Sequence, residues 1–218
     1  MSDWARVRVE TRLKGGATEL LQVAAAFGLL EAALWSTGFM QVFWGLALLA
    51  FAGIALAATE SNARDLGLLP AGTRRALWII PTALAIGGSI LFLGGMAGTL
   101  HRLGGHNGAW WRALLYALWS VVQQFLLQSF IFTRLEAVLE RRTAVLASAL
   151  LFAVAHLPNP ALVPLTLLAG LVLTELFWRY RNIYVLGVAH AIMGLCIAAA
   201  FPDQLTHAMH VGIAYYFR

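Results

Sequence analysis

The sequence predicts an all-α, polytopic membrane helical bundle of about seven spans, with its N-terminus in the cytoplasm. Three observations carry this prediction. Of the 218 residues, 61% are hydrophobic and 11% are charged, whereas a soluble domain has roughly 25% charged residues. Apolar runs close to the length of a membrane helix, about 20 residues, alternate with short polar loops. Lys and Arg gather in alternate loops, which is the charge bias that sets orientation in a membrane.

We expect four parts along the chain. Residues 1–18 form a basic amphipathic lead-in at the membrane surface or, equally, a frayed polar terminus. Residues 19–110 hold the N-terminal spans and loops, residues 111–200 a core, and residues 201–218 an amphipathic tail too short for a further span. The seven spans are placed at about residues 20–35, 39–58, 77–97, 111–132, 143–157, 161–178 and 183–200.

The distribution of basic residues supports both the span count and the orientation. Of the 15 Lys and Arg residues, twelve fall in segments predicted to lie inside and two in segments predicted to lie outside, with Arg218 at an unplaced end. The net charge of +5 is therefore explained by topology and by anionic lipid headgroups, and we expect no nucleic-acid partner. With the single Cys196 there is no disulfide framework. We expect an integral multi-pass protein of a bacterial cytoplasmic membrane, whose partner is the lipid bilayer.

Three polar clusters interrupt the otherwise apolar spans of the core. They are Gln123, Gln124 and Gln128 in the fourth span, His156 at the end of the fifth with Asn159 just beyond it, and His190 in the seventh. Buried amides and imidazoles are costly in hydrocarbon unless they face each other or water. The clusters therefore predict one shared polar pocket. Taken singly, each glutamine is more simply explained as interhelical hydrogen bonding, and each histidine as a packed, hydrogen-bonded side chain.

The spacing of these residues suggests how they face the pocket. Gln124 and Gln128 are four residues apart and share one helical face, while Gln123 lies about 100° round the helix. The two histidines, His156 and His190, could act on water, orient a carbonyl group or hold a metal ion. Zinc requires further N, S or O donors, and the sequence has no HExxH or CxxC pattern. We therefore expect no cofactor, with a metal ion at the two histidines as the alternative.

This arrangement resembles the CPBP membrane proteins, a family of CAAX prenyl endopeptidases and of bacteriocin-processing and immunity proteins. The family pattern is Glu-Glu-x-x-x-Arg on one span, Phe-x-x-x-His on the next and His-x-x-x-Asn on a later one. The second motif is intact as Phe152-Ala-Val-Ala-His156. The third keeps His190 but has Gly194 where the family has Asn. The resemblance covers roughly residues 111–200.

The first motif departs from the family. It aligns with Gln123-Gln124-Phe-Leu-Leu-Gln128, so that both glutamates and the arginine are replaced. The resemblance implies that the first glutamate activates water, that the histidines position it, and that the Asn with a histidine forms an oxyanion site. A glutamine amide does not accept a proton at neutral pH, and general acid–base catalysis typically contributes about 10²–10⁴-fold. Loss of the Asn equivalent removes a donor worth roughly 2.7–4 kcal/mol in comparable oxyanion sites.

The resemblance implies a CPBP-type intramembrane endopeptidase that hydrolyses a peptide bond of a lipidated or membrane-associated peptide, in the manner of CAAX processing. The replaced glutamates argue that this hydrolysis is impaired. The alternative is a non-proteolytic protein of the same fold that binds a lipidated peptide or an isoprenoid, or that acts as a partner or immunity protein.

Two acidic residues within the spans are candidates for a relocated base or for proton-dependent chemistry or transport. Glu175 lies near the end of the sixth span, where pairing with Arg179, four residues on, is the simpler explanation. Glu31 lies in the first span, which has no basic residue of its own, and therefore needs a partner on another helix.

Overall fold

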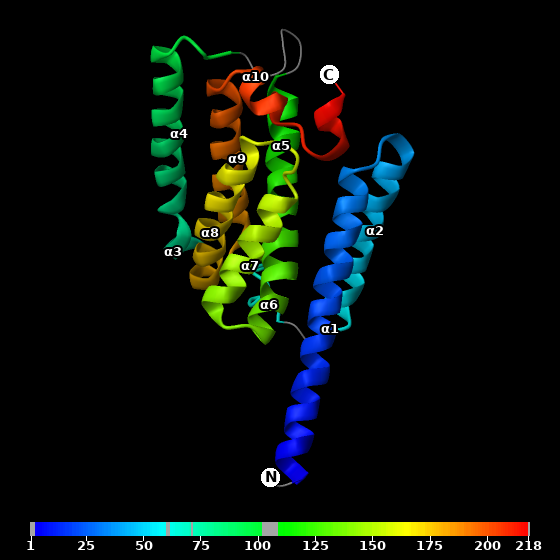
Figure 1. Ribbon diagram of the computed structural model, residues 1–218. Helices are drawn as coiled ribbons and strands as arrows, with labels where there is room; N and C mark the ends of the chain where they lie inside the picture. Colours follow the sequence, from blue (N-terminus) through cyan, green and yellow to red (C-terminus); the bar gives the residue numbers. More distant parts are fainter. Residues whose placement is uncertain (1–2, 60–61, 71, 102–108, 218) are drawn as a thin grey trace.

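The computed structural model describes residues 3–59, 62–70, 72–101 and 109–217. Over these residues the chain is helical and has no strand. The elements are α1 (Asp3–Leu34), α2 (Gly38–Ala57), α3 (Thr73–Ala76), α4 (Ile79–Met96), α5 (Ala109–Gln124), the π-helix η1 (Phe125–Phe132), α6 (Thr133–Val138), α7 (Arg141–Val154), α8 (Leu162–Tyr180), α9 (Ile183–Ala200), α10 (Asp203–Thr206) and the 3₁₀ turns η2 (His207–Met209) and η3 (Gly212–Tyr216) (Figure 1).

Six helical segments in the described ranges are long and apolar enough to cross a membrane. They are Gly16–Leu34, Gly38–Ala57, Thr73–Met96, Trp110–Val138, Leu162–Tyr180 and Ile183–Ala200. The prediction of an all-helical, multi-pass membrane protein is thereby confirmed, with six such segments instead of seven. The missing one is the predicted fifth span, because α7 has 14 residues. At 1.5 Å per residue it is roughly 21 Å long, shorter than a hydrocarbon core of about 30 Å.

Small residues let the helices of the core approach closely. A Cβ added at Gly187 of α9 would lie 2.6 Å from Val121 Cγ2 of α5, and one added at Gly170 of α8 would lie 2.9 Å from Ala149 Cα of α7. Contacts between backbones of this kind are how membrane helices pack without a hydrophobic driving force between them. The helices α5, α7, α8 and α9 therefore form one tightly packed group.

The α1–α2 hairpin stands to one side of this group (Figure 1). Near one end, Arg134 of α6 is buried and its Nε donates to Gln22 Oε1 of α1 at 2.6 Å. The same Nε lies 3.5 Å from Glu19 Oε2. Near the other end, the backbone of Leu34 packs against Gly212 of the tail, so closely that a Cβ at this glycine would overlap it. The hairpin is thus anchored near both ends.

The tail, residues 203–217, folds back over the connection between α7 and α8. The Asn159 side-chain amide donates to the carbonyl groups of Thr206 at 2.7 Å and His210 at 3.0 Å. The backbone N–H of Gly212 donates to the Leu157 carbonyl at 2.7 Å. The Gly212 bond supplies a partner for the Leu157 carbonyl beyond the end of the short α7, and the Asn159 bonds do the same for two carbonyl groups of the tail. Hydrocarbon would leave such groups unsatisfied.

Candidate active site

A cavity of about 340 Å³ lies where α5, α8 and α9 meet the tail. Its polar lining comes from Tyr116, Gln123, His156, Thr166 and His190. None of the described residues around it carries a carboxylate. A smaller cavity of about 80 Å³ shares Gln123 and His156 and is walled on its other side by apolar side chains of α1. The predicted polar pocket is therefore present as a space, with its amide and imidazole groups on three different elements.

His190 is held by a chain of buried amides. The Nε2 amide of Gln124 donates to His190 Nδ1 at 3.1 Å. Gln128 Nε2 in turn donates to Gln124 Oε1 and to Thr174 Oγ1, each at 3.2 Å. Gln124, Gln128 and Thr174 are all fully buried. Because Nδ1 accepts a hydrogen bond, the neutral ring carries its proton on Nε2. His190 therefore presents an N–H donor.

His156 has the opposite tautomer. Its Nδ1 lies 2.7 Å from the Phe152 carbonyl oxygen, and a carbonyl can only accept, so Nδ1 carries the proton and Nε2 keeps its lone pair. The Phe152 ring also makes edge contacts with both imidazoles, at centroid distances of 4.8 Å to His156 and 5.7 Å to His190. One phenylalanine thus positions a proton acceptor and a proton donor around the same space.

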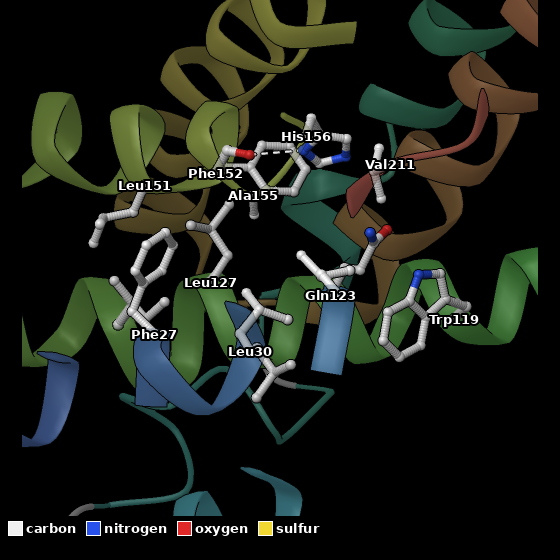
Figure 2. Close-up of a pocket in the computed structure, with 13 residues that line it drawn as sticks. Phe27, Leu30, Trp119, Gln123, Leu127, Leu151, Phe152, Ala155, His156 and Val211 are labelled. Atoms are coloured by element: carbon white, nitrogen blue, oxygen red, sulfur yellow. Dashed lines mark hydrogen bonds between the residues drawn. The ribbon is translucent and has the colours of Figure 1, made fainter. Parts of the chain in front are cut away.

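Gln123 faces the cavities, unlike its neighbour Gln124. It lines both, and its Oε1 is buried without a hydrogen-bond partner among the described residues. Figure 2 shows its amide on α5 directed toward the side of the pocket that holds His156 and Val211. A buried amide oxygen without a partner costs roughly 1–3 kcal/mol. The Gln123 amide is therefore available to bind a ligand or water.

Comparison with known protein families places this region. Residues 105–196 match the family described as Type II CAAX prenyl endopeptidase Rce1-like. This segment is Rce1-like. It contains the three glutamines, both histidines and Gly194, and it confirms the resemblance derived from the motifs. A search of curated proteins gives no match.

Asn159, which follows the second motif of the Rce1-like segment, is fully occupied by structural hydrogen bonds. Its Oδ1 accepts from the backbone N–H groups of Ala161 and Leu162, at 3.2 and 3.1 Å, and so caps the start of α8. Its amide nitrogen holds the tail. Asn159 is buried and does not line either cavity. Its position supports a structural role for its side chain.

The two membrane acids also lie away from the cavities. Glu175 forms ion pairs with Arg141 and Arg179, the latter at 2.9 Å. Glu31 accepts from Trp35 Nε1 at 3.0 Å, and its other oxygen is buried without a described partner. Neither glutamate lines the cavities that hold the histidines. In the described ranges, no three His, Cys, Asp or Glu side chains are grouped so that they could hold a metal ion.

Sequence reasoning missed Tyr116 and Thr174. A signal for the tyrosine exists, because Tyr116, Ser120, Gln124 and Gln128 recur at every fourth residue along one span. This spacing places polar groups along one helical face, and the face points at α9. Thr174 has no comparable signal, since a threonine in a membrane helix usually bonds to its own backbone.

Proposed function

We propose that the protein is an Rce1-like intramembrane endopeptidase for lipid-modified or membrane-proximal peptides, with impaired water activation. The observation that carries the proposal is the pair of opposite tautomers on one cavity. His156 Nε2 can accept a proton from water while the water oxygen attacks the peptide carbonyl carbon. The His190 N–H can hydrogen-bond the carbonyl oxygen as it gains charge. The proton then passes to the leaving nitrogen as the C–N bond breaks, giving an acid and an amine.

The amide at position 123 makes this hydrolysis slow. In the family pattern a carboxylate stands there, and the amide of Gln123 can orient water but cannot take its proton. A positioned general base contributes about 10²–10⁴-fold, and a neutral imidazole alone replaces only part of that. We therefore expect turnover well below that of a glutamate-based enzyme.

The apolar surroundings favour a substrate with a lipid chain. A third cavity, about 230 Å³, lies between α1, α2 and η1. It shares four lining residues with the smaller histidine-lined cavity, which are Leu30, Leu34, Trp119 and Leu126. Apart from Gln41, its lining is apolar or glycine. Burial of a CH₂ group contributes about 0.8 kcal/mol, so an alkyl or isoprenoid chain would gain affinity there. Its peptide would then extend toward Gln123. We also propose that the protein lies in a bacterial cytoplasmic membrane with its N-terminus in the cytoplasm.

The first test measures cleavage of a prenylated fluorogenic peptide by the purified protein in lipid nanodiscs. We expect His156→Ala and His190→Ala each to lower the rate at least about 10²-fold, since each removes a group that acts on the reacting atoms. The matched control is His101→Ala, because the His101 ring lies 3.6 Å from the Asp203 carboxylate and outside both cavities. Activity that survives both cavity substitutions would overturn the proposal.

The second test restores the family motif with Gln123→Glu, Gln124→Glu and Gln128→Arg together. Because the side chain at 123 faces the cavity, a carboxylate there should act on water, and we expect cleavage to rise by about 10²-fold. The single Gln123→Glu substitution is measured beside it. An unchanged rate in both variants would show that the missing carboxylate does not limit hydrolysis.

A second candidate function is binding without hydrolysis. It is favoured by the absence of any carboxylate from the described lining of both histidine-containing cavities. In that case the parent protein binds the prenylated peptide, releases no product, and loses affinity in the restored variant without gaining cleavage. Product release by the parent protein that depends on His156 would exclude this function.

A further inference from the structure

Gly194 leaves a space on α9 that a side chain of α5 fills. A Cβ added at Gly194 would overlap the Tyr116 hydroxyl oxygen and lie 2.7 Å from Cζ and 2.9 Å from Cε1 of the same ring. Gly194 comes four residues after His190, one helical turn further along the same face. The tip of the Tyr116 ring therefore occupies the position that a side chain at 194 would take.

The Tyr116 ring belongs to the cavity wall. Tyr116, His190 and Gly194 all line the larger cavity, together with Gln123 and His156. The centroids of the Tyr116 and His190 rings are 6.5 Å apart, and the ring planes are nearly perpendicular, at 88°. A phenol is protonated at neutral pH and can donate a hydrogen bond. Two donors, the phenol O–H and the imidazole N–H, thus come from two different helices to one end of the cavity.

We propose that Tyr116 is a catalytic residue whose hydroxyl donates a hydrogen bond to the substrate carbonyl oxygen beside the His190 N–H. This inference rests on the proposed hydrolase function. The two donors together stabilise the negative charge that develops on that oxygen when water attacks. The phenol keeps its proton throughout, so no bond to Tyr116 forms or breaks. Removing one donor from such a site typically lowers kcat by about 10²–10³-fold.

A purely structural role for the ring makes a different prediction. If Tyr116 only fills the space beside Gly194, Tyr116→Phe keeps the ring and should change neither kcat nor KM. If the hydroxyl contacts the reacting oxygen, the same substitution should lower kcat about 10²-fold and leave KM within a factor of about three. The matched control is Tyr184→Phe, because the Tyr184 hydroxyl bonds to the Leu68 carbonyl outside the cavity.

An exchange of donors gives a second measurement. Tyr116→Ala should remove the donor, and Gly194→Asn alone should force the tyrosine ring out of place, so each should lower kcat. The double variant gives an asparagine amide the volume that the ring vacates. We expect it to regain at least about tenfold over either single variant. A double variant no better than the worse single variant would overturn the assignment.

A readout without turnover separates this inference from the proposed function. The probe is a phosphonamidate analogue of the prenylated peptide, which carries a tetrahedral anionic centre, compared with the uncleaved peptide. Tyr116→Phe should weaken binding of the analogue about 10²-fold and leave peptide binding within about threefold. If the parent protein fails to cleave but shows this difference, the hydrolase proposal is wrong and the donor is correctly placed. Equal binding by Tyr116→Phe and parent protein would overturn the inference itself.

Discussion

The two sides of the three neighbouring cavities are built in different ways. The α5–α8–α9 side is called the fixed wall. In it the Gln124–Gln128–Thr174 hydrogen bonds hold His190 in place, and glycines bring the helix backbones into contact. On the α1–α2 side, the described lining is almost entirely apolar. Here α1 is held at Gln22 by Arg134 and at Leu34 by the tail. Hydrogen bonds and close packing resist displacement more than apolar contacts do. The contrast teaches that the amide and imidazole groups are held by directional hydrogen bonds, whereas the α1–α2 side is held mainly by apolar contacts.

The largest expected effect comes from the fixed wall. Gly187→Val would push its new side chain into Val121 and separate α9 from α5. We expect a loss of about 3 kcal/mol of unfolding free energy, measured by unfolding in mixed detergent micelles. The control is Gly53→Val, since nothing lies within 4 Å of a Cβ at Gly53. Equal losses in the two variants would mean that the fixed wall is no more tightly packed than the hairpin.

The next effect concerns the tail that covers the cavity. Asn159→Asp keeps the oxygen that caps α8 and removes the two donors to the tail. Residues 207–209 have positive φ values of 48°, 51° and 62°, a conformation that costs energy in non-glycine residues, so the tail depends on outside bonds. At about 1 kcal/mol for each lost bond, we expect a loss of about 2 kcal/mol. Hydrogen exchange in residues 203–217 should rise, and unchanged exchange would contradict the assignment.

A smaller effect is expected at the anchor of the α1–α2 wall. Arg134→Met keeps much of the aliphatic volume and removes the bonds to Gln22 and Glu19. A hydrogen bond that involves a charged group contributes about 1.5–3 kcal/mol. The net loss of unfolding free energy is at the lower end of this range, because Glu19 is partly solvated and water can replace its lost partner. We expect a loss of about 1.5 kcal/mol and faster proteolysis between α1 and α2. Arg64→Met, at an exposed position, serves as the control and should change neither quantity.

The smallest effect tests one bond of the fixed wall. Thr174→Val removes the acceptor for Gln128 Nε2 while keeping the shape of the side chain. We expect a loss of about 1 kcal/mol, with lowered activity because the bonds that hold His190 loosen. Thr82→Val is the control, because the Thr82 hydroxyl donates to the Trp78 carbonyl, four residues earlier in the same span. If both variants lose the same stability, the amide chain is not what stiffens this wall.

Much of the architecture could be predicted because membrane helices follow from composition and charge. The prediction of a fifth span at residues 143–157 was wrong, because the apolar helix α7 ends at Val154. Proline at 158 and 160 was identified as a stop, yet the length that remains before it is too short for a span. What the sequence did not reveal is that residues 203–217 fold back over the connection between α7 and α8, since this depends on distant hydrogen bonds from Asn159.

The sequence placed Gln123, His156 and His190 around one cavity, as the structure has them, but it missed Tyr116 and Thr174, and the roles of all these residues stay predictions. Helical spacing placed Gln124 with Gln128 and turned Gln123 away, and the structure has this arrangement. Which face meets the cavity depends on tertiary packing. So does the role of Tyr116, because its neighbour Gly194 is 78 positions further on in the sequence and only the fold brings the two together.

The π-helix η1 links the cavity to the α1 anchor. In it the backbone bonds skip five residues, as in the bond from Thr133 N–H to the Gln128 carbonyl, so each turn holds nearly one residue more than an α-helix. A segment wound in this way behaves as an α-helix with a surplus residue. Deleting one residue of 125–132 would therefore rotate Gln124 against Arg134 far less than the same deletion in a regular helix. We therefore expect length variation to be best tolerated at this point of the span, between Gln124 of the amide chain and Arg134, which anchors the α1–α2 hairpin.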